Sequence, residues 1–113
     1  MEKFISKLRR LPRFEVRLGR LQKIQNQFEQ KQVDILFGLD MQKLSFLHVV
    51  QKFIIVTGDS DFVPVIKIAK NEGTITHLFY NPAEYVHAEL IMCCDERSVL
   101  DQKLIEKCLL LKT

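Results

Sequence analysis

Two aspartates, Asp59 and Asp61, stand two positions apart directly after the apolar segment Phe53–Thr57. That segment is typical of a buried strand, and the Phe62-Val63-Pro64 that follows is typical of a helix start. Ligands of open α/β sheets bind at the carboxyl ends of strands. Two neighbouring carboxylates repel each other unless a divalent cation, a shared proton or basic neighbours offset their charge. The spacing therefore indicates a metal site, although Asp59 or Ser60 could instead serve as a helix cap.

Two further acids, Asp34 and Asp40, lie in the preceding segment, where the apolar residues predict a helix over about Val33–Phe46. Asp34 in the first turn is favoured by the helix dipole whatever else it does, whereas Asp40 in the middle of the helix has no such structural reason. Six positions separate the two acids by about 120° around the axis, so they do not share one narrow face. At most one of them points squarely at a given site unless the helix bends.

The elements that would position these acids follow from the hydrophobic pattern along the chain. Upstream of residue 33 we expect a helix over 2–10, a half-buried strand over Phe14–Leu18, and a loop or poorly anchored helix over 20–32. After the strand Phe53–Thr57 the chain should form a helix over 62–71, a strand over 75–80, a helix over 83–94, a short strand over 98–100 and a helix over 101–111 capped by Asp101. This alternation predicts parallel βαβ units in a three-layer α/β/α sandwich with a mainly parallel sheet.

The chain has 113 residues, of which 47% are hydrophobic, so we expect a single domain over 1–113 with its own core. The net charge of +3 is mild, but nine Lys and Arg against three Glu fall within residues 1–31. Four of these bases are candidates for contacts with a nucleic-acid backbone, the alternative being a solvated basic face. They are Arg17, Arg20, Lys23 and Lys31.

Cysteine spacing and hydropathy indicate in which cellular compartment the protein is expected. Cys93, Cys94 and Cys108 fit neither a disulfide framework nor a zinc site, so we expect reduced and mostly buried thiols. The sequence contains no apolar stretch of about 20 residues and no signal peptide. A soluble, cytoplasmic protein with no membrane contact is predicted.

Several segments together resemble one family. Lys31-Gln32-Val33-Asp34, Leu39-Asp40 and the run from Ile55 to Pro64 closely resemble the NYN domain, a branch of the PIN-like nuclease superfamily. Phe14–Val16 looks like that family's second strand, and Leu90–Asp95 looks like its late helix. The likeness covers roughly residues 10–100, and the segment Gly58–Phe62 is its most specific part.

The resemblance implies a PIN-like fold and a cluster of aspartates that holds one or two Mg²⁺ or Mn²⁺ ions. Such a site would hydrolyse RNA, and we expect the substrate to be single-stranded. Carried over residue by residue, Asp34, Asp40, Asp59 and Asp61 are the catalytic acids. Asp34, Asp59 and Asp61 are the implied metal ligands, and Thr57 and Ser60 would orient carboxylates or water. Hard oxygen ligands suit these hard cations, which can lower the pKa of a bound water.

The chain departs from the family pattern at its start. Members open with an apolar strand that ends in an aspartate, a principal metal ligand, and no such segment precedes the helix expected over 2–10. We therefore expect an N-terminally incomplete domain, through a truncated or misannotated start, a remnant that has lost catalysis, or a homo-oligomer that fills the gap by strand exchange. Two functions stay open: a metal-dependent endoribonuclease, and a non-catalytic module for RNA binding or protein assembly.

Overall fold

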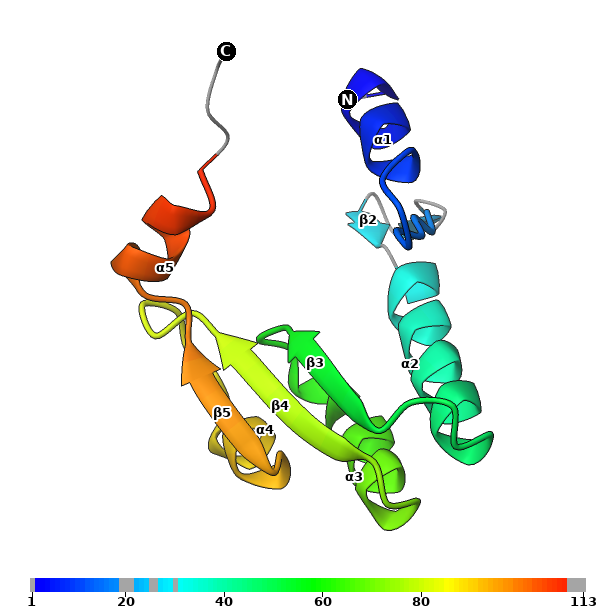
Figure 1. Ribbon diagram of the computed structural model, residues 1–113, viewed down its shortest axis with the longest axis vertical. Helices are drawn as coiled ribbons and strands as arrows, with labels where there is room; N and C mark the ends of the chain where they lie inside the picture. Colours follow the sequence, from blue (N-terminus) through cyan, green and yellow to red (C-terminus); the bar gives the residue numbers. More distant parts are fainter. Residues whose placement is uncertain (1, 19–21, 25–26, 30, 110–113) are drawn as a thin grey trace. The chain divides into compact units, whose positions relative to one another are not determined.

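The computed structural model describes residues 2–18, 22–24, 27–29 and 31–109, and its contacts divide the chain into two units, Met1–Phe37 and Gly38–Thr113 (Figure 1). The first contains α1 (Glu2–Arg9), the antiparallel pair β1 (Gln22–Ile24) and β2 (Gln27–Glu29), and the beginning of α2 (Lys31–Phe46). The second contains the rest of α2 and every element that follows it.

A three-stranded parallel sheet forms the centre of the second unit, with the strand order β3-β4-β5. Its strands are β3 (Lys52–Val56), β4 (Ile75–Tyr80) and β5 (Glu96–Val99). The helical elements that join or follow them are the 3₁₀ turn η1 (Ser60–Phe62), α3 (Val63–Asn71), α4 (Ala88–Cys93) and α5 (Gln102–Lys107). Strands that alternate with helices confirm the α/β class and the parallel sheet expected from the sequence.

One face of this sheet is covered by α3 and α4, as the ribbon shows (Figure 1). Ile55 and Leu78 point to that face because side chains alternate along a strand, and they are buried together with Ile66 and Ala69 of α3 and Leu90 of α4. Burial of these aliphatic side chains is the main favourable term in the stability of the unit. It also fixes the strand register, since a slip by one residue would turn Ile55 outward.

The opposite face of the sheet is largely open. Ile54 and Val56 of β3 are 66% and 63% exposed. Helix α5 approaches this face and contributes Leu104 and Ile105 to an apolar cavity of about 780 Å³ that Ile54, Val56 and Phe79 also line. Helices therefore flank the sheet on both sides, as the PIN-like arrangement requires.

The carboxyl-terminal part of α2 belongs to the second unit and packs near the amino ends of the strands. Met41 and Ser45, one helical turn apart, are both buried. The Ser45 hydroxyl lies 3.0 Å from that of Thr74, which directly precedes β4, and 3.5 Å from the carbonyl oxygen of Ala69. These polar contacts allow a serine to be fully buried at this contact.

Three sequence predictions about local structure are wrong. Residues 14–18 are not a strand, because alternation makes a strand only where a neighbour completes the ladder, and the described residues supply none. Within 20–32, the short strands β1 and β2 replace the expected loop or helix by pairing with each other. Helix α4 begins at Ala88 and not near Ala83, since the Asn81 side chain and carbonyl bind the amides of Ala83 and Glu84 in a turn.

The other elements are close to their predicted bounds, except that β5 begins two residues early, at Glu96, and α5 ends at Lys107 and does not continue towards Leu111. Helix α2 starts two residues earlier than expected, β4 has the predicted bounds, and Asp101 caps α5 by accepting the Leu104 amide at 2.8 Å. All three cysteines are free; Cys93 and Cys94 are buried, whereas Cys108 is exposed. Burial raises the pKa of the Cys94 thiol to about 11. Among the described helices, none is both long enough and apolar enough to cross a membrane.

Candidate metal centre

The turn after β3 holds the two aspartates that the sequence singled out. Asp59 has an extended backbone, and its amide donates a hydrogen bond to the Thr57 hydroxyl at 3.1 Å. Its Oδ1 accepts the Asp61 amide at 2.9 Å, so Asp59 is the cap of η1. The capping interpretation is therefore correct for Asp59, and it occupies only one of the two carboxylate oxygens. Thr57 fixes the backbone of Asp59 and not its carboxylate.

Buried anchors on the far side of the turn hold this geometry in place. Phe62 and Val63 are 7% and 5% exposed and lie where η1 passes into α3. Pro64 suits the first turn of α3, where an amide has no partner in the helix. Asp59 is half-buried, whereas Ser60 and Asp61 are exposed. The turn thus presents its polar groups outward while its apolar residues enter the core.

The charges of Asp59 and Asp61 are not offset by neighbouring bases. Within the described parts of the chain, neither aspartate forms an ion pair with Lys, Arg or His. Carboxylate oxygens are the ligands that hard divalent cations prefer. No group of three or more His, Cys, Asp or Glu among the described residues comes close enough to hold a metal ion. Among the described residues, Asp59 and Asp61 therefore offer two carboxylate ligands and no third one beside them.

The two acids of α2 fall in different units. Asp34 lies in the first unit, where its side chain is exposed. Asp40 lies in the second unit, half-buried and about 7.5 Å along the helix axis from Ser45, and it sits beside the buried stripe of Met41 and Ser45. Since Ser45 marks the amino end of the strands, Asp40 is placed only part of the way towards the turn after β3.

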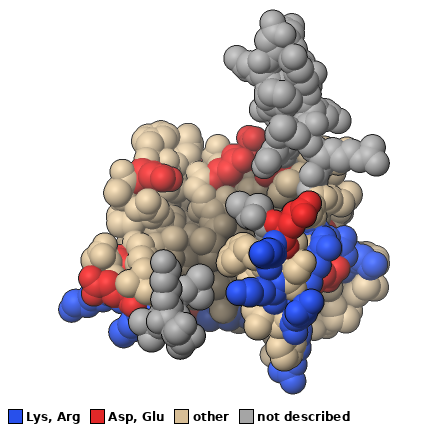
Figure 2. Space-filling view, turned by 90° about the horizontal axis from the view of Figure 1, so that it is seen from above, with Lys and Arg blue, Asp and Glu red and all other residues tan. Residues whose placement is uncertain are grey.

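The four candidate bases belong to the first unit. Arg17 is exposed and donates to Glu15, with its Nη2 3.1 Å from Glu15 Oε1. Lys23 lies in β1 and Lys31 begins α2, whereas Arg20 falls outside the described residues. Figure 2 shows many Lys and Arg side chains gathered over one part of the visible surface, with Asp and Glu side chains among them. An exposed ion pair such as Arg17–Glu15 contributes little to stability.

Sequence reasoning missed the loop 81–87, which follows the carboxyl end of the neighbouring strand. Because β3 and β4 are parallel and Val56 pairs with Phe79, this loop and the Asp59 turn emerge at the same edge of the sheet. A Cβ atom on Gly58 would lie 3.8 Å from Cγ2 of Val86, so the loop contacts the turn. The signal that could have found this loop is that it follows β4, the strand paired with β3. That position indicates Asn81 and Tyr85 as residues near the site.

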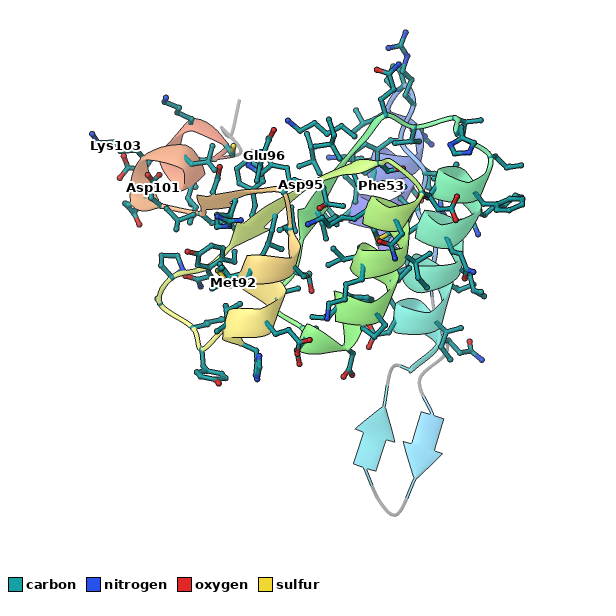
Figure 3. All side chains as sticks on the ribbon, turned by 90° about the horizontal axis from the view of Figure 1, so that it is seen from below. Phe53, Met92, Asp95, Glu96, Asp101 and Lys103 are labelled. Atoms are coloured by element: carbon teal, nitrogen blue, oxygen red, sulfur yellow. The ribbon has the colours of Figure 1, made fainter. Side chains whose placement is uncertain are left out.

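A second set of acids lies at the amino end of the sheet. Oδ2 of Asp95 accepts both the amide and the hydroxyl of the buried Thr76, at 2.8 and 3.1 Å, and Oδ1 lies 3.5 Å from Lys70 Nζ. Because Thr76 pairs with Phe53, Asp95 is remote from the turn that carries Asp59 (Figure 3). Asp95 therefore lies outside the candidate site and serves the sheet at its other end.

The hydrogen bonds at the amino end of the sheet lower the pKa values of two acids, Asp95 and Glu96. For Asp95 the main cause is the hydrogen bond from the Thr76 amide, with Lys70 adding to it. For Glu96 the hydrogen bond from Lys52, at 2.7 Å, lowers the pKa, and His77, with Nδ1 2.9 Å from the same carboxylate oxygen, adds to it. These acids are held by their neighbours and serve the fold.

Comparisons with known proteins agree with this architecture. The crystal structure of a protein of unknown function from Vibrio parahaemolyticus superposes with a TM-score of 0.72 and 24% sequence identity. The match covers 89% of this chain and 60% of the Vibrio chain, so this chain spans about three fifths of that protein's length. At this identity the likeness shows a shared fold. The comparison with curated proteins gives no match.

The family assignment comes from the sequence match that accompanies this fold. The model of the NYN domain family matches residues 1–101, which is most of the chain and includes the Asp59 turn and the whole parallel sheet. The chain therefore belongs to the NYN domain family, a branch of the PIN-like superfamily.

Proposed function

We propose that this protein is a metal-dependent endoribonuclease that hydrolyses single-stranded RNA at its aspartates. The observation that carries the proposal is the pair of half-buried Asp59 and exposed Asp61 at the carboxyl end of a parallel strand, with no base to offset them among the described residues. In a family of PIN-like nucleases, acids in this position serve as ligands of a divalent cation. The NYN family membership supports RNA as the substrate.

The donor set fits Mg²⁺ or Mn²⁺, because carboxylate oxygens are the ligands these hard cations prefer. Asp59 and Asp61 would hold the ion, with Asp34 as a further ligand and Asp40 as an additional acid of the site. The bound ion would make water a better nucleophile and offset charge on the phosphodiester. The chain's own contribution is to aim the Asp59 carboxylate, since the hydrogen bond from the Asp61 amide to Asp59 Oδ1 fixes it against the backbone of the turn.

The Thr57 hydroxyl and the Ser60 carbonyl serve the turn. Thr57 holds the Asp59 amide, and the carbonyl of Ser60 accepts the Val63 amide, so both keep the strand-to-helix passage closed. In the proposed enzyme Thr57 and Ser60 support the carboxylates from the backbone side. Arg17, Arg20, Lys23 and Lys31 would contact RNA phosphates.

The test is cleavage of an unstructured RNA by the full chain in Mg²⁺ or Mn²⁺, with EDTA as the metal-free reference. Asp59→Asn keeps an oxygen for the cap but loses the charge, and we expect at least about a 100-fold loss of rate, since even indirect partners of a metal cost 10- to 100-fold. Asp95→Asn is the matched control at the other end of the sheet and should cleave like the unaltered chain.

Two outcomes would overturn the proposal. Cleavage that continues in EDTA, or that survives Asp59→Asn unchanged, would exclude a metal at this turn. Absence of cleavage together with RNA binding that Asp59→Asn leaves intact would instead support the non-catalytic module, with the aspartates as a remnant.

A further inference from the structure

Tyr85 is the most exposed large apolar side chain among the described residues, at 87%. It lies in the loop 81–87, between β4 and α4. Single exposed apolar side chains are common on protein surfaces, so exposure alone assigns no role to this ring. Its place in the fold is more informative.

The loop that carries Tyr85 contacts the turn that carries the two aspartates. The next residue, Val86, is half-buried, and its Cγ2 lies 3.8 Å from where a Cβ on Gly58 would stand. Gly58 directly precedes Asp59. Since α4, which follows the loop, also packs against η1, the chain contacts the aspartate turn twice, at Gly58 through Val86 and at η1 through α4. Tyr85 is thus one residue from direct contact with this turn.

Hydrogen bonds fix the loop on both sides of the ring. Before it, Asn81 accepts the Ala83 amide with its side chain at 3.0 Å and the Glu84 amide with its carbonyl at 3.2 Å. After it, His87 caps α4 by accepting the Glu89 amide on Nδ1 at 3.1 Å. Because these bonds hold the backbone on both sides of Tyr85, binding a partner there costs little loop entropy.

We propose that Tyr85 stacks on an unpaired base of single-stranded RNA whose phosphodiester lies at Asp59 and Asp61. An aromatic ring stacks on any base, but bases in a duplex already stack on one another, so this contact selects single strands without selecting sequence. The inference rests on the proposed function and adds a residue that discriminates between unpaired and paired RNA.

The experiment measures binding of a labelled RNA of about 12 nucleotides to the full chain by fluorescence anisotropy in EDTA, where cleavage is not expected. Tyr85→Ala should weaken binding of the single strand about 5- to 150-fold, the range found for loss of one stacked base. Tyr85→Phe keeps the ring and should bind within about twofold. Phe46→Ala removes another exposed ring, 68% exposed at the end of α2, and should change nothing.

An abasic series then identifies the stacked nucleotide. Removing one base at a time should weaken binding to the unaltered chain at one position, and that effect should vanish in Tyr85→Ala because ring and base form one interaction. Equal effects in both proteins at every position, or a loss in Tyr85→Ala that is as large for a duplex, would overturn the inference.

The outcomes separate this inference from the proposed function. If the chain does not cleave RNA but Tyr85→Ala weakens single-strand binding, the nuclease proposal fails and the stacking role stands. If cleavage occurs and Tyr85→Ala binds normally, only the stacking role fails. A chain that binds no single-stranded RNA overturns both.

Discussion

At the amino end of the parallel sheet, Asp95 and Glu96 are neutralised by neighbours, whereas at the carboxyl end Asp59 and Asp61 are not. Asp95 completes the hydrogen bonding of buried Thr76 and lies near Lys70, and Glu96 binds Lys52. Asp59 and Asp61 interact through a carboxylate and an amide, with no base from the described residues. Acids with satisfied charges stabilise a fold, and acids whose charges stay open can bind a cation.

The difference follows from how each acid enters the sheet. Asp95 precedes β5, where its side chain extends the ladder by accepting the Thr76 amide one step before Glu96 pairs with His77. That position gives the carboxylate a structural task. Asp59 and Asp61 follow β3, where the turn needs only one carboxylate oxygen for a cap. The sheet therefore uses acids for folding at one end and leaves them available at the other.

The largest expected effect concerns metal binding. In titration calorimetry with Mn²⁺, Asp59→Asn should weaken binding at least about tenfold, because a ligand charge is lost, while Asp95→Asn should bind like the unaltered chain. Both variants keep an oxygen acceptor at the altered position. If Mn²⁺ binding falls equally in the two variants, the distinction between the ends of the sheet is wrong.

For the free energy of unfolding the order of the two positions should reverse, with the larger effect at Asp95 and the smaller at Asp59. Asp95→Ala leaves the buried Thr76 amide and hydroxyl without their acceptor and should lower the free energy of unfolding by about 1–3 kcal/mol. Asp59→Asn preserves the cap and should change it by less than about 0.5 kcal/mol. Urea unfolding followed by circular dichroism measures both. A larger loss in Asp59→Asn would show that the carboxyl end also carries structural acids.

Acid should act on the amino end through Asp95 and Glu96. Their pKa values are lowered in the folded chain from 3.8 and 4.5, so their stabilisation is present above those values and is lost as pH falls through the lower folded pKa values. Urea midpoints between neutral pH and pH 3 should fall, and less steeply in Asp95→Asn. An equal slope in both proteins would contradict the assigned role of Asp95.

The smallest expected effect is that of the exposed pair Lys52–Glu96. Lys52→Met should lower thermal stability slightly at low ionic strength and not at about 1 M salt, where charges are screened within about 3 Å. A loss that persists in high salt would mean that the stem of Lys52 packs on the sheet face and that its charge is secondary.

How far local pattern predicts this fold differs between particular segments. The strand Ile75–Tyr80 and the cap Asp101 were predicted as found, because each depends on a run of apolar residues or on one side chain near its own backbone. The strand predicted for Phe14–Leu18 is wrong, because a strand needs a partner that the pattern does not name. The predicted start of α4 is wrong because Asn81 binds the amide of Ala83 in a turn, and the helix begins only after that turn.

The candidate site shows the same division. Sequence reasoning singled out Asp59 and Asp61 by the abrupt end of an apolar strand. It did not consider Tyr85, since nothing in the segment 81–87 shows that Val86 will meet Gly58. That contact joins residues 28 positions apart. Proximity of this kind depends on which strands become neighbours.

By itself the sequence determined the alternation of strands and helices, the NYN resemblance and the two acids that end β3, because these depend on local patterning and residue type. The tertiary structure decided which acids are neutralised, by bringing Thr76 and Lys70 to Asp95 and no base to Asp59 among the described residues. The physical reason is that charge compensation acts over a few ångströms in space, and distance along the chain does not specify it.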